Sequence, residues 1–257
     1  MLEALHLTKR YASLPAAQDV SFTLHPGQVL GCLGPNGSGK STTVKMLTGL
    51  LEPTRGEVLF NGQNIRNNLS AYRKRLGYVP EEAHLYPYLT GWEYLELIGT
   101  LRGMPRPELE KKIDSLLNLF SLHAHRHAGV GSYSKGMRQR VLLIAALMDN
   151  PDIFIFDEPL SGLDVTSALI FKNLVQALGQ QGKLVFYCSH VLEVVEKVCS
   201  DVLILRKGVV IAQDSVANIG QILGQSLENT FLHLVDDVDT VGVARDIVAV
   251  MRASQER

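Results

Sequence analysis

Nine consecutive residues have the types and spacing that hold a phosphate group. They read Gly-Pro-Asn-Gly-Ser-Gly-Lys-Ser-Thr and fit the pattern G-x-x-x-x-G-K-[ST]. Glycines without a Cβ let the backbone turn tightly and aim its N–H groups at an anion. Lys40 adds positive charge for the β- and γ-phosphates, and the Ser41 hydroxyl can bind Mg²⁺. The loop therefore predicts a nucleotide site formed by Gly34, Pro35, Asn36, Gly37, Ser38, Gly39, Lys40, Ser41 and Thr42.

Two neighbouring carboxylates follow a second short apolar run. Residues 153–156 predict a buried strand, and the carboxyl ends of such strands lie at the edge of the sheet where ligands bind. Successive side chains of a strand point in different directions, so the two acids can have different roles. We expect Asp157 to hold Mg²⁺ opposite Ser41, and Glu158 to act as general base toward the attacking water.

The elements that position these groups follow a recognisable order. The apolar run 29–33 before the phosphate loop predicts a strand, and a helix begins near Lys40 with its positive end toward the phosphate. Asn61-Gly62 predicts a hairpin among antiparallel strands, and a loop is expected between the first two strands. The segment from Tyr72 to Asn150 is expected to be helical, with Thr90 and Glu93 forming a capping box. Later apolar strands alternate with helices, which indicates a parallel sheet covered on both faces. The predicted strands are 2–7, 20–24, 57–60, 153–156, 184–188 and 202–205, and the predicted helices are 91–103, 107–120, 135–148, 167–178, 192–199, 227–232 and 241–251.

Composition and charge disfavour several classes of protein. The 257 residues carry a formal net charge of −1, so the broad basic footprint of a nucleic-acid-binding protein is missing. Cys32, Cys188 and Cys199 each lie in an apolar run, which predicts buried free thiols in a reducing compartment. The N-terminal residues do not resemble a signal peptide. The longest apolar run, 141–148, is far shorter than the ~20 residues that a membrane span needs.

One further stretch, Tyr133 to Arg140, connects these motifs to a family. It begins Tyr-Ser-Lys-Gly-Met and resembles the Leu-Ser-Gly-Gly-Gln signature of the nucleotide-binding subunits of ATP-binding cassette (ABC) transporters. The resemblance implies that Ser134, Lys135 and Gly136 face the γ-phosphate of ATP bound by an opposite subunit. Lys135 stands where the family has a glycine.

The resemblance assigns roles to four other residues. Tyr11 resembles the aromatic residue that stacks on adenine, although ordinary strand packing is the alternative. Asp164 lies in a segment resembling the loop that crosses the dimer interface, and His190 resembles the histidine that contacts the γ-phosphate. Glu81 stands where the family usually has the glutamine that senses Mg²⁺. A carboxylate keeps the acceptor, loses the amide donor and adds negative charge.

The implied fold is α/β: a P-loop NTPase (ABC ATPase) core with an antiparallel β subdomain and an inserted α-helical subdomain. We expect a single ABC ATPase domain over 1–257. Residues 1–84 and 151–215 would form the core with the β subdomain, 85–150 the helical signature subdomain and 216–257 a C-terminal helical tail.

The implied function is ATP hydrolysis that powers a separate transmembrane permease, with ATP and Mg²⁺ bound and two chains facing each other. The stretches around residues 78–91 and 133–137 look most like exporter-type ATPases. Such a subunit lies in the cytoplasm, peripheral on the inner face of the cell membrane. Direct action on nucleic acid is not expected.

Three alternatives are weighed against this interpretation. Soluble ABC ATPases that act on DNA or the ribosome usually carry tandem cassettes, a coiled-coil insert or basic extensions, and none is visible. A scaffold without turnover is disfavoured by the set Lys40, Asp157, Glu158 and His190. Alternating histidines at 123, 125 and 127 suggest a metal site, but a solvated loop is the better interpretation because they lie in a polar connection without a nearby cysteine.

Overall fold

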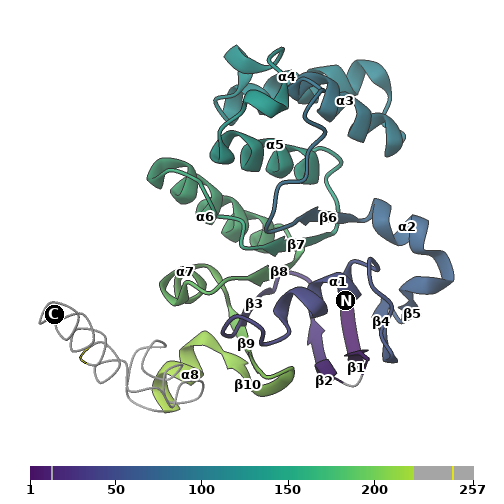
Figure 1. Cartoon of the computed structure of the whole chain (residues 1–257), viewed down its shortest axis with the longest axis vertical. Helices are drawn as coiled ribbons and strands as arrows, with labels where there is room; N and C mark the ends of the chain where they lie inside the picture. Colours follow the sequence, from purple (N-terminus) through teal and green to yellow (C-terminus); the bar gives the residue numbers. More distant parts are fainter. Residues whose placement is uncertain (13, 223–244, 246–257) are drawn as a thin grey trace, which may run out of the picture.

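The chain, described for residues 1–12, 14–222 and 245 of a computed structural model, is built on two β-sheets (Figure 1). The larger sheet has the strand order β10-β9-β3-β8-β7-β6. Its neighbours are parallel except β9 and β10, which pair antiparallel. The strands are β3 (Val29–Leu33), β6 (Leu76–Val79), β7 (Ile153–Asp157), β8 (Leu184–Cys188), β9 (Asp201–Arg206) and β10 (Val209–Ser215).

The smaller sheet is antiparallel and has the order β2-β1-β4-β5. Its last pair is the hairpin predicted from Asn61-Gly62, with Phe60 opposite Gln63. The first two strands extend several residues beyond the predicted 2–7 and 20–24, so the segment expected as a loop between them is mostly a long hairpin. The strands are β1 (Leu2–Tyr11), β2 (Leu14–Leu24), β4 (Arg55–Phe60) and β5 (Gln63–Asn64).

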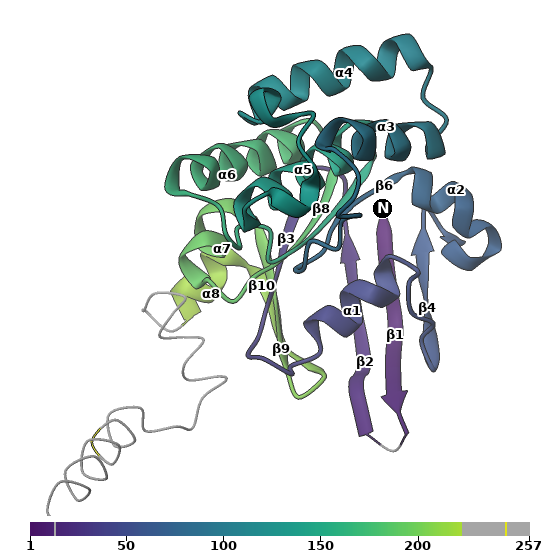
Figure 2. The ribbon, with the colours of Figure 1, turned by 45° about the horizontal axis from the view of Figure 1, so that its top comes forward.

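Helices cover the sheets, and the five predicted over 91–103, 107–120, 135–148, 167–178 and 192–199 are present with ends within two residues of the predicted ones. Helix Leu69–Lys74 was not predicted, and Val216–Ile222 lies in the segment expected as a helical tail. The capping box expected at Thr90 and Glu93 is present at the start of α3. Figure 2 shows α3, α4 and α5 together as a helical block beside the large sheet. Predicted helices 227–232 and 241–251 lie outside the described residues. The helices are α1 (Lys40–Leu47), α2 (Leu69–Lys74), α3 (Gly91–Leu101), α4 (Arg106–Leu119), α5 (Lys135–Leu147), α6 (Val165–Gln180), α7 (Leu192–Val198) and α8 (Val216–Ile222).

Apolar side chains of β7 point alternately to the two faces of the large sheet, and both faces are buried there. Ile153 and Ile155 pack with α1 and the antiparallel sheet. Phe154 and Phe156 pack on the opposite face with α5, α6 and α7. A third apolar cluster joins α3, α4 and α5. Since every side chain of β7 is buried, its carboxyl end is fixed in position, and Asp157 with it.

One expectation about the middle of the chain was wrong. The segment from Tyr72 to Asn150 was expected to be helical, but Leu76–Val79 forms β6, the edge strand paired with β7. Gly77 in this strand lies against α5, where an added Cβ would meet the Ala146 carbonyl oxygen at 2.6 Å. A four-residue strand containing a glycine gives almost no periodic signal, because tertiary packing selects it.

Candidate active site

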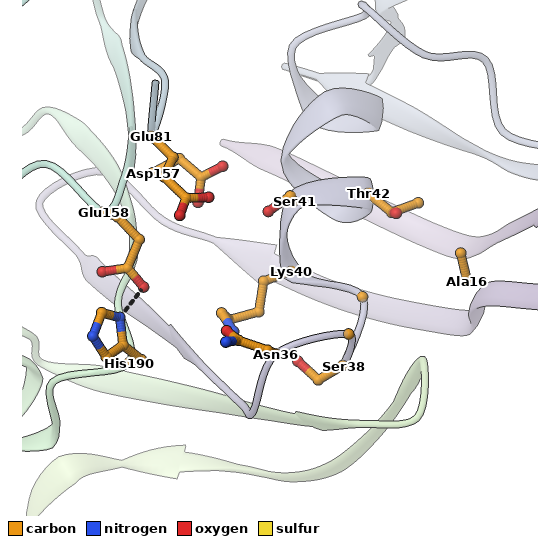
Figure 3. Close-up of a pocket in the computed structure, with 12 residues that line it drawn as sticks. Ala16, Asn36, Ser38, Lys40, Ser41, Thr42, Glu81, Asp157, Glu158 and His190 are labelled. Carbon is orange, nitrogen blue, oxygen red and sulfur yellow. Dashed lines mark hydrogen bonds and ion pairs between the residues drawn. The ribbon is translucent and has the colours of Figure 1, made fainter. Parts of the chain in front are cut away.

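The predicted residues from four separate elements line one cavity of about 340 Å³ (Figure 3). The phosphate loop and the start of α1 form one wall, and the ends of β7 and β8 form the other. Glu81, just after β6, completes the second wall. The lining residues are Ala16, Asn36, Gly37, Ser38, Gly39, Lys40, Ser41, Thr42, Glu81, Asp157, Glu158 and His190.

The start of α1 leaves backbone donors free at this cavity. Its N-cap residue, Gly39, has φ of 105° and makes no side-chain capping bond. An added Cβ at Gly39 would meet the Ala16 carbonyl oxygen at 2.5 Å, so only glycine fits between the loop and β2. Because the first N–H groups of a helix lack intrahelical acceptors, this end of α1 favours an anion.

Lys40 is folded back into its own loop. Its Nζ donates hydrogen bonds to the carbonyl oxygens of Gly34, at 2.6 Å, and Pro35, at 3.1 Å. Among the described residues, the Ser38 hydroxyl is one of three buried side-chain groups with an atom that lacks a hydrogen-bond partner. A buried polar group without a partner is costly, and a phosphate oxygen would supply one. The loop therefore holds donors suited to a phosphorylated ligand.

Asp157 is buried at the end of β7. Burial, with the added repulsion of Glu81 and Glu158, raises the pKa of its carboxyl to about 6, although Lys40 and Lys45 act in the opposite direction. The Ser41 hydroxyl points toward the carboxylates of Asp157 and Glu81 (Figure 3). Oxygen donors and crowded negative charge are what a hard divalent cation prefers. These three residues fit Mg²⁺.

Glu158 follows directly but adopts a different backbone conformation. Its φ is 49°, in the left-handed region, which costs a non-glycine residue on the order of 1–3 kcal/mol. Its N–H donates to the Cys188 carbonyl oxygen at 3.0 Å, tying the turn to β8. Its Oε1 lies 2.7 Å from His190 Nδ1, and the Ser189 hydroxyl lies 3.4 Å from its Oε2. Contacts from the end of β8 and the residues after it therefore orient the Glu158 carboxylate.

Seven of the predicted ligand residues do not line this cavity, and two of them, Gly34 and Pro35, begin the phosphate loop and accept hydrogen bonds from Lys40. Tyr11 lies at the end of β1 with 51% of its surface exposed and Lys9 above its ring, and it is not among the residues that line the cavity. Ser134 caps α5 and Asp164 caps α6. The bonds from Ser167 hold the pKa of Asp164 below its usual range. The signature residues Ser134, Lys135 and Gly136 lie beside the loop that precedes α6, where an added Cβ at Gly136 would meet the Gly162 carbonyl oxygen at 2.5 Å.

Sequence reasoning missed two residues near the site. Ala16 lines the cavity from the irregular β1–β2 hairpin, and its type carries no chemical signal. Gln139 is buried in α5 and donates to the Pro159 carbonyl oxygen at 3.1 Å. Because Gln139 lies between two arginines, before the apolar run of this helix, the local sequence gives no sign that it is buried.

The alternating histidines have other partners. His123 Nε2 lies 3.0 Å from Asp114 Oδ1, and the His125 carbonyl oxygen accepts a bond from Tyr133. In the described part of the chain, no three His, Cys, Asp or Glu side chains cluster so as to hold a metal ion. All three cysteines are buried and free, as predicted.

Comparison with known proteins decides the family. The family model described as "ABC transporter" matches residues 17–161. The chain belongs to the ABC transporter family. It is similar to the ABC transporter ATP-binding protein NatA of Bacillus subtilis (strain 168), at 37% identity over 79% of this chain and 83% of NatA. The ATP-binding protein EcsA of the same organism is 32% identical over 92% of this chain and 97% of EcsA.

Solved structures give the same fold. An ATP-binding subunit of an ABC transporter superposes with a TM-score of 0.85 at 31% identity, covering 91% of this chain and 99% of that one. The ATP-binding cassette MJ0796, solved as a dimer in a post-hydrolysis state with ADP and Pi, has a TM-score of 0.78 at 26% identity, covering 84% and 98%. This ABC ATP-binding subunit is thus an ATPase with the predicted P-loop NTPase fold. Within its described residues, no helix is long and apolar enough to cross a bilayer.

Proposed function

We propose that this subunit hydrolyses ATP at the cavity between the phosphate loop and the ends of β7 and β8. The observation that carries the proposal is the meeting of Lys40, Ser41, Asp157, Glu158 and His190 at one cavity. Lys40 and the loop N–H groups would bind the phosphates, with Lys40 exchanging its bonds to loop carbonyls for bonds to phosphate oxygens. ATP and water would react to give ADP and phosphate, which would then leave the cavity.

Glu158 would take the proton of the attacking water, and His190 would orient Glu158 while reaching the γ-phosphate. The 2.7 Å contact between the two side chains supports this division. Ser41, Asp157 and Glu81 would hold Mg²⁺, which when bound neutralises charge developing on the phosphates. A positioned general base contributes about 10²–10⁴-fold in rate. Tyr11 remains the proposed adenine contact.

We also propose that two chains form the complete site. Ser134, Lys135, Gly136 and Asp164 lie outside the chain's own cavity yet sit at the starts of two helices, where free N–H groups favour an anion. In a facing arrangement they would close over ATP held by the other copy. The dimeric form of the related cassette supports this arrangement. Each copy would then supply one half of each site.

The proposed two-chain site gives each part of the chain a separate role. Residues 1–84 and 151–215 would bind ATP, 85–150 would present the signature, and 216–257 would form a tail. Hydrolysis would drive a separate permease, of the exporter type, with this subunit on the cytoplasmic face of the membrane. The exposed rings of Tyr86 and Tyr88, just before α3, offer a contact for that membrane protein.

Affinity purification of the full chain from detergent-solubilised membranes tests this coupling. We expect a multi-span membrane protein to co-purify, and Tyr88→Ser to weaken its recovery, because Tyr88 is 95% exposed beside the helical block. Leu119→Ser, at a residue 73% exposed on α4, is the matched control and should leave recovery unchanged. Co-purification of ribosomes or DNA in place of a membrane protein would contradict the transport role.

A further inference from the structure

Gln139 is a buried polar side chain that lies between Arg138 and Arg140, just before α5 becomes apolar. It is 1% exposed in α5, followed by the buried run Val141 to Ala146. Burying an amide in such surroundings is unfavourable unless it is hydrogen-bonded. Its Nε2 donates to one acceptor, the carbonyl oxygen of Pro159, at 3.1 Å. The sequence separation of 20 residues makes this a link between two elements.

The acceptor belongs to the turn that presents Glu158. Inside this turn, the Ser161 N–H donates to the Glu158 carbonyl oxygen at 3.1 Å. Glu158 itself holds a left-handed conformation that a free chain would leave. Pro159 has no N–H, so its carbonyl is the backbone group through which this position can be held by a hydrogen bond. The bond from Gln139 therefore braces the turn from outside.

We infer that Gln139 is a positioning residue for hydrolysis, which fixes Pro159 and thereby the place and direction of the Glu158 carboxylate. The inference rests on the proposed role of Glu158 as general base. Gln139 does not line the nucleotide cavity, so its effect passes through the turn. It also ties the signature helix of each chain to that chain's own base, beside the close Gly136–Gly162 contact. A small displacement of a reacting group costs up to ~10²-fold in rate.

The test is the steady-state kinetics of Gln139→Met and Gln139→Leu, two apolar variants that lack the donor. We expect kcat to fall about 10- to 100-fold while the KM for ATP stays within about twofold. Gln176→Met is the matched control, because Gln176 likewise donates its amide to a carbonyl, that of Lys197 at 2.8 Å, away from the cavity. It should leave both parameters unchanged.

A second measurement separates positioning of Glu158 from support of the signature helix. In the Glu158→Gln background, adding Gln139→Met should leave ATP affinity and ATP-dependent dimerisation unchanged, since the group that Gln139 positions no longer acts as a base. Loss of the dimer there would overturn the inference. So would wild-type kcat in both single variants, or loss of folding in both. Hydrolysis at the wild-type rate in Glu158→Gln alone would instead refute the proposed function.

Discussion

The Oε1 atom of Glu158 lies 2.7 Å from Nδ1 of His190, which joins the ends of two neighbouring strands, β7 and β8, across the mouth of the cavity. The two strands are in register up to Asp157 and Cys188, so both side chains leave the sheet at the same level. A base held by a second group keeps its orientation when substrate enters. This pair forms part of the cavity wall that faces the phosphate loop (Figure 3).

Replacing the histidine should slow catalysis more than it weakens binding. For His190→Ala we expect kcat to fall about 10- to 100-fold, because Glu158 loses its orienting partner and the γ-phosphate loses a contact. The KM for ATP should change less than about threefold. His6→Ala is a matched control, since His6 Nδ1 also lies 2.7 Å from a carboxylate, that of Asp19, and neither residue lines the cavity. Equal kinetic losses in the two variants would contradict the assignment.

Glu81 gives a prediction about magnesium. Its carboxylate lines the cavity and adds to the negative charge around Asp157. Glu81→Gln should therefore raise the Mg²⁺ concentration needed for half-maximal hydrolysis, because one anionic oxygen donor is lost. Glu82→Gln changes the next residue, whose exposed carboxylate contacts only His84 among the described ion pairs, and should leave the Mg²⁺ dependence unchanged. If the Mg²⁺ dependence of hydrolysis is unchanged in Glu81→Gln, Glu81 does not have the proposed role.

The raised pKa of Asp157 predicts how stability changes with pH when nucleotide and Mg²⁺ are absent. The pKa of its carboxyl is about 6 in the folded chain, against an ordinary value of 3.8. The folded state therefore binds more protons between these values, and this group's contribution to stability falls as the pH rises from about 4 to 6. Above pH 6 the destabilisation is complete.

Asp157→Asn removes that ionisation. At pH 7.5 we expect the variant to be more stable than the wild type by up to ~3 kcal/mol in urea unfolding with chelator present, and the difference should vanish near pH 4. Glu196→Gln, at an exposed residue of α7, is the control and should show no such trend. A stability difference that stays constant with pH would contradict the assigned titration.

Gly136 tests the proposed second half of the site. A methyl group at this position would meet the Gly162 carbonyl oxygen at 2.5 Å, so the start of α5 must shift. We expect Gly136→Ala to lower hydrolysis at least about tenfold while nucleotide binding by the single chain is retained, because Gly136 does not line the cavity. Gly129→Ala is the control, since its added Cβ comes no closer than 3.7 Å to a neighbour. Full activity of Gly136→Ala would argue against the signature role.

The sequence predicted the parts of this molecule whose local chemistry is strong. The phosphate loop, the buried strand before Asp157 and the capped helices carry turn, burial and capping signals within a few residues. The sequence did not predict strand β6, because this strand is short and is stabilised by packing against β7 and α5.

The finer contacts of the site depend on long-range geometry. Ala16 lines the cavity because of an irregular hairpin, and Gln139 meets Pro159 only once α5 is docked. The left-handed conformation of Glu158 is likewise set by the turn toward β8 and not by residue type. Such contacts join residues far apart in the chain, and no local pattern encodes them.

The most direct test of the account is Glu158→Gln in the full chain, assayed for ATP binding, ATP hydrolysis and mass in solution with ATP and Mg²⁺. The amide keeps the shape and the contact to His190 but cannot accept the proton of water. We predict that ATP binding persists, that hydrolysis is lost by at least ~10²-fold, and that the chain accumulates as an ATP-bound dimer. Hydrolysis at the wild-type rate, with no dimer formed, would contradict the central claim.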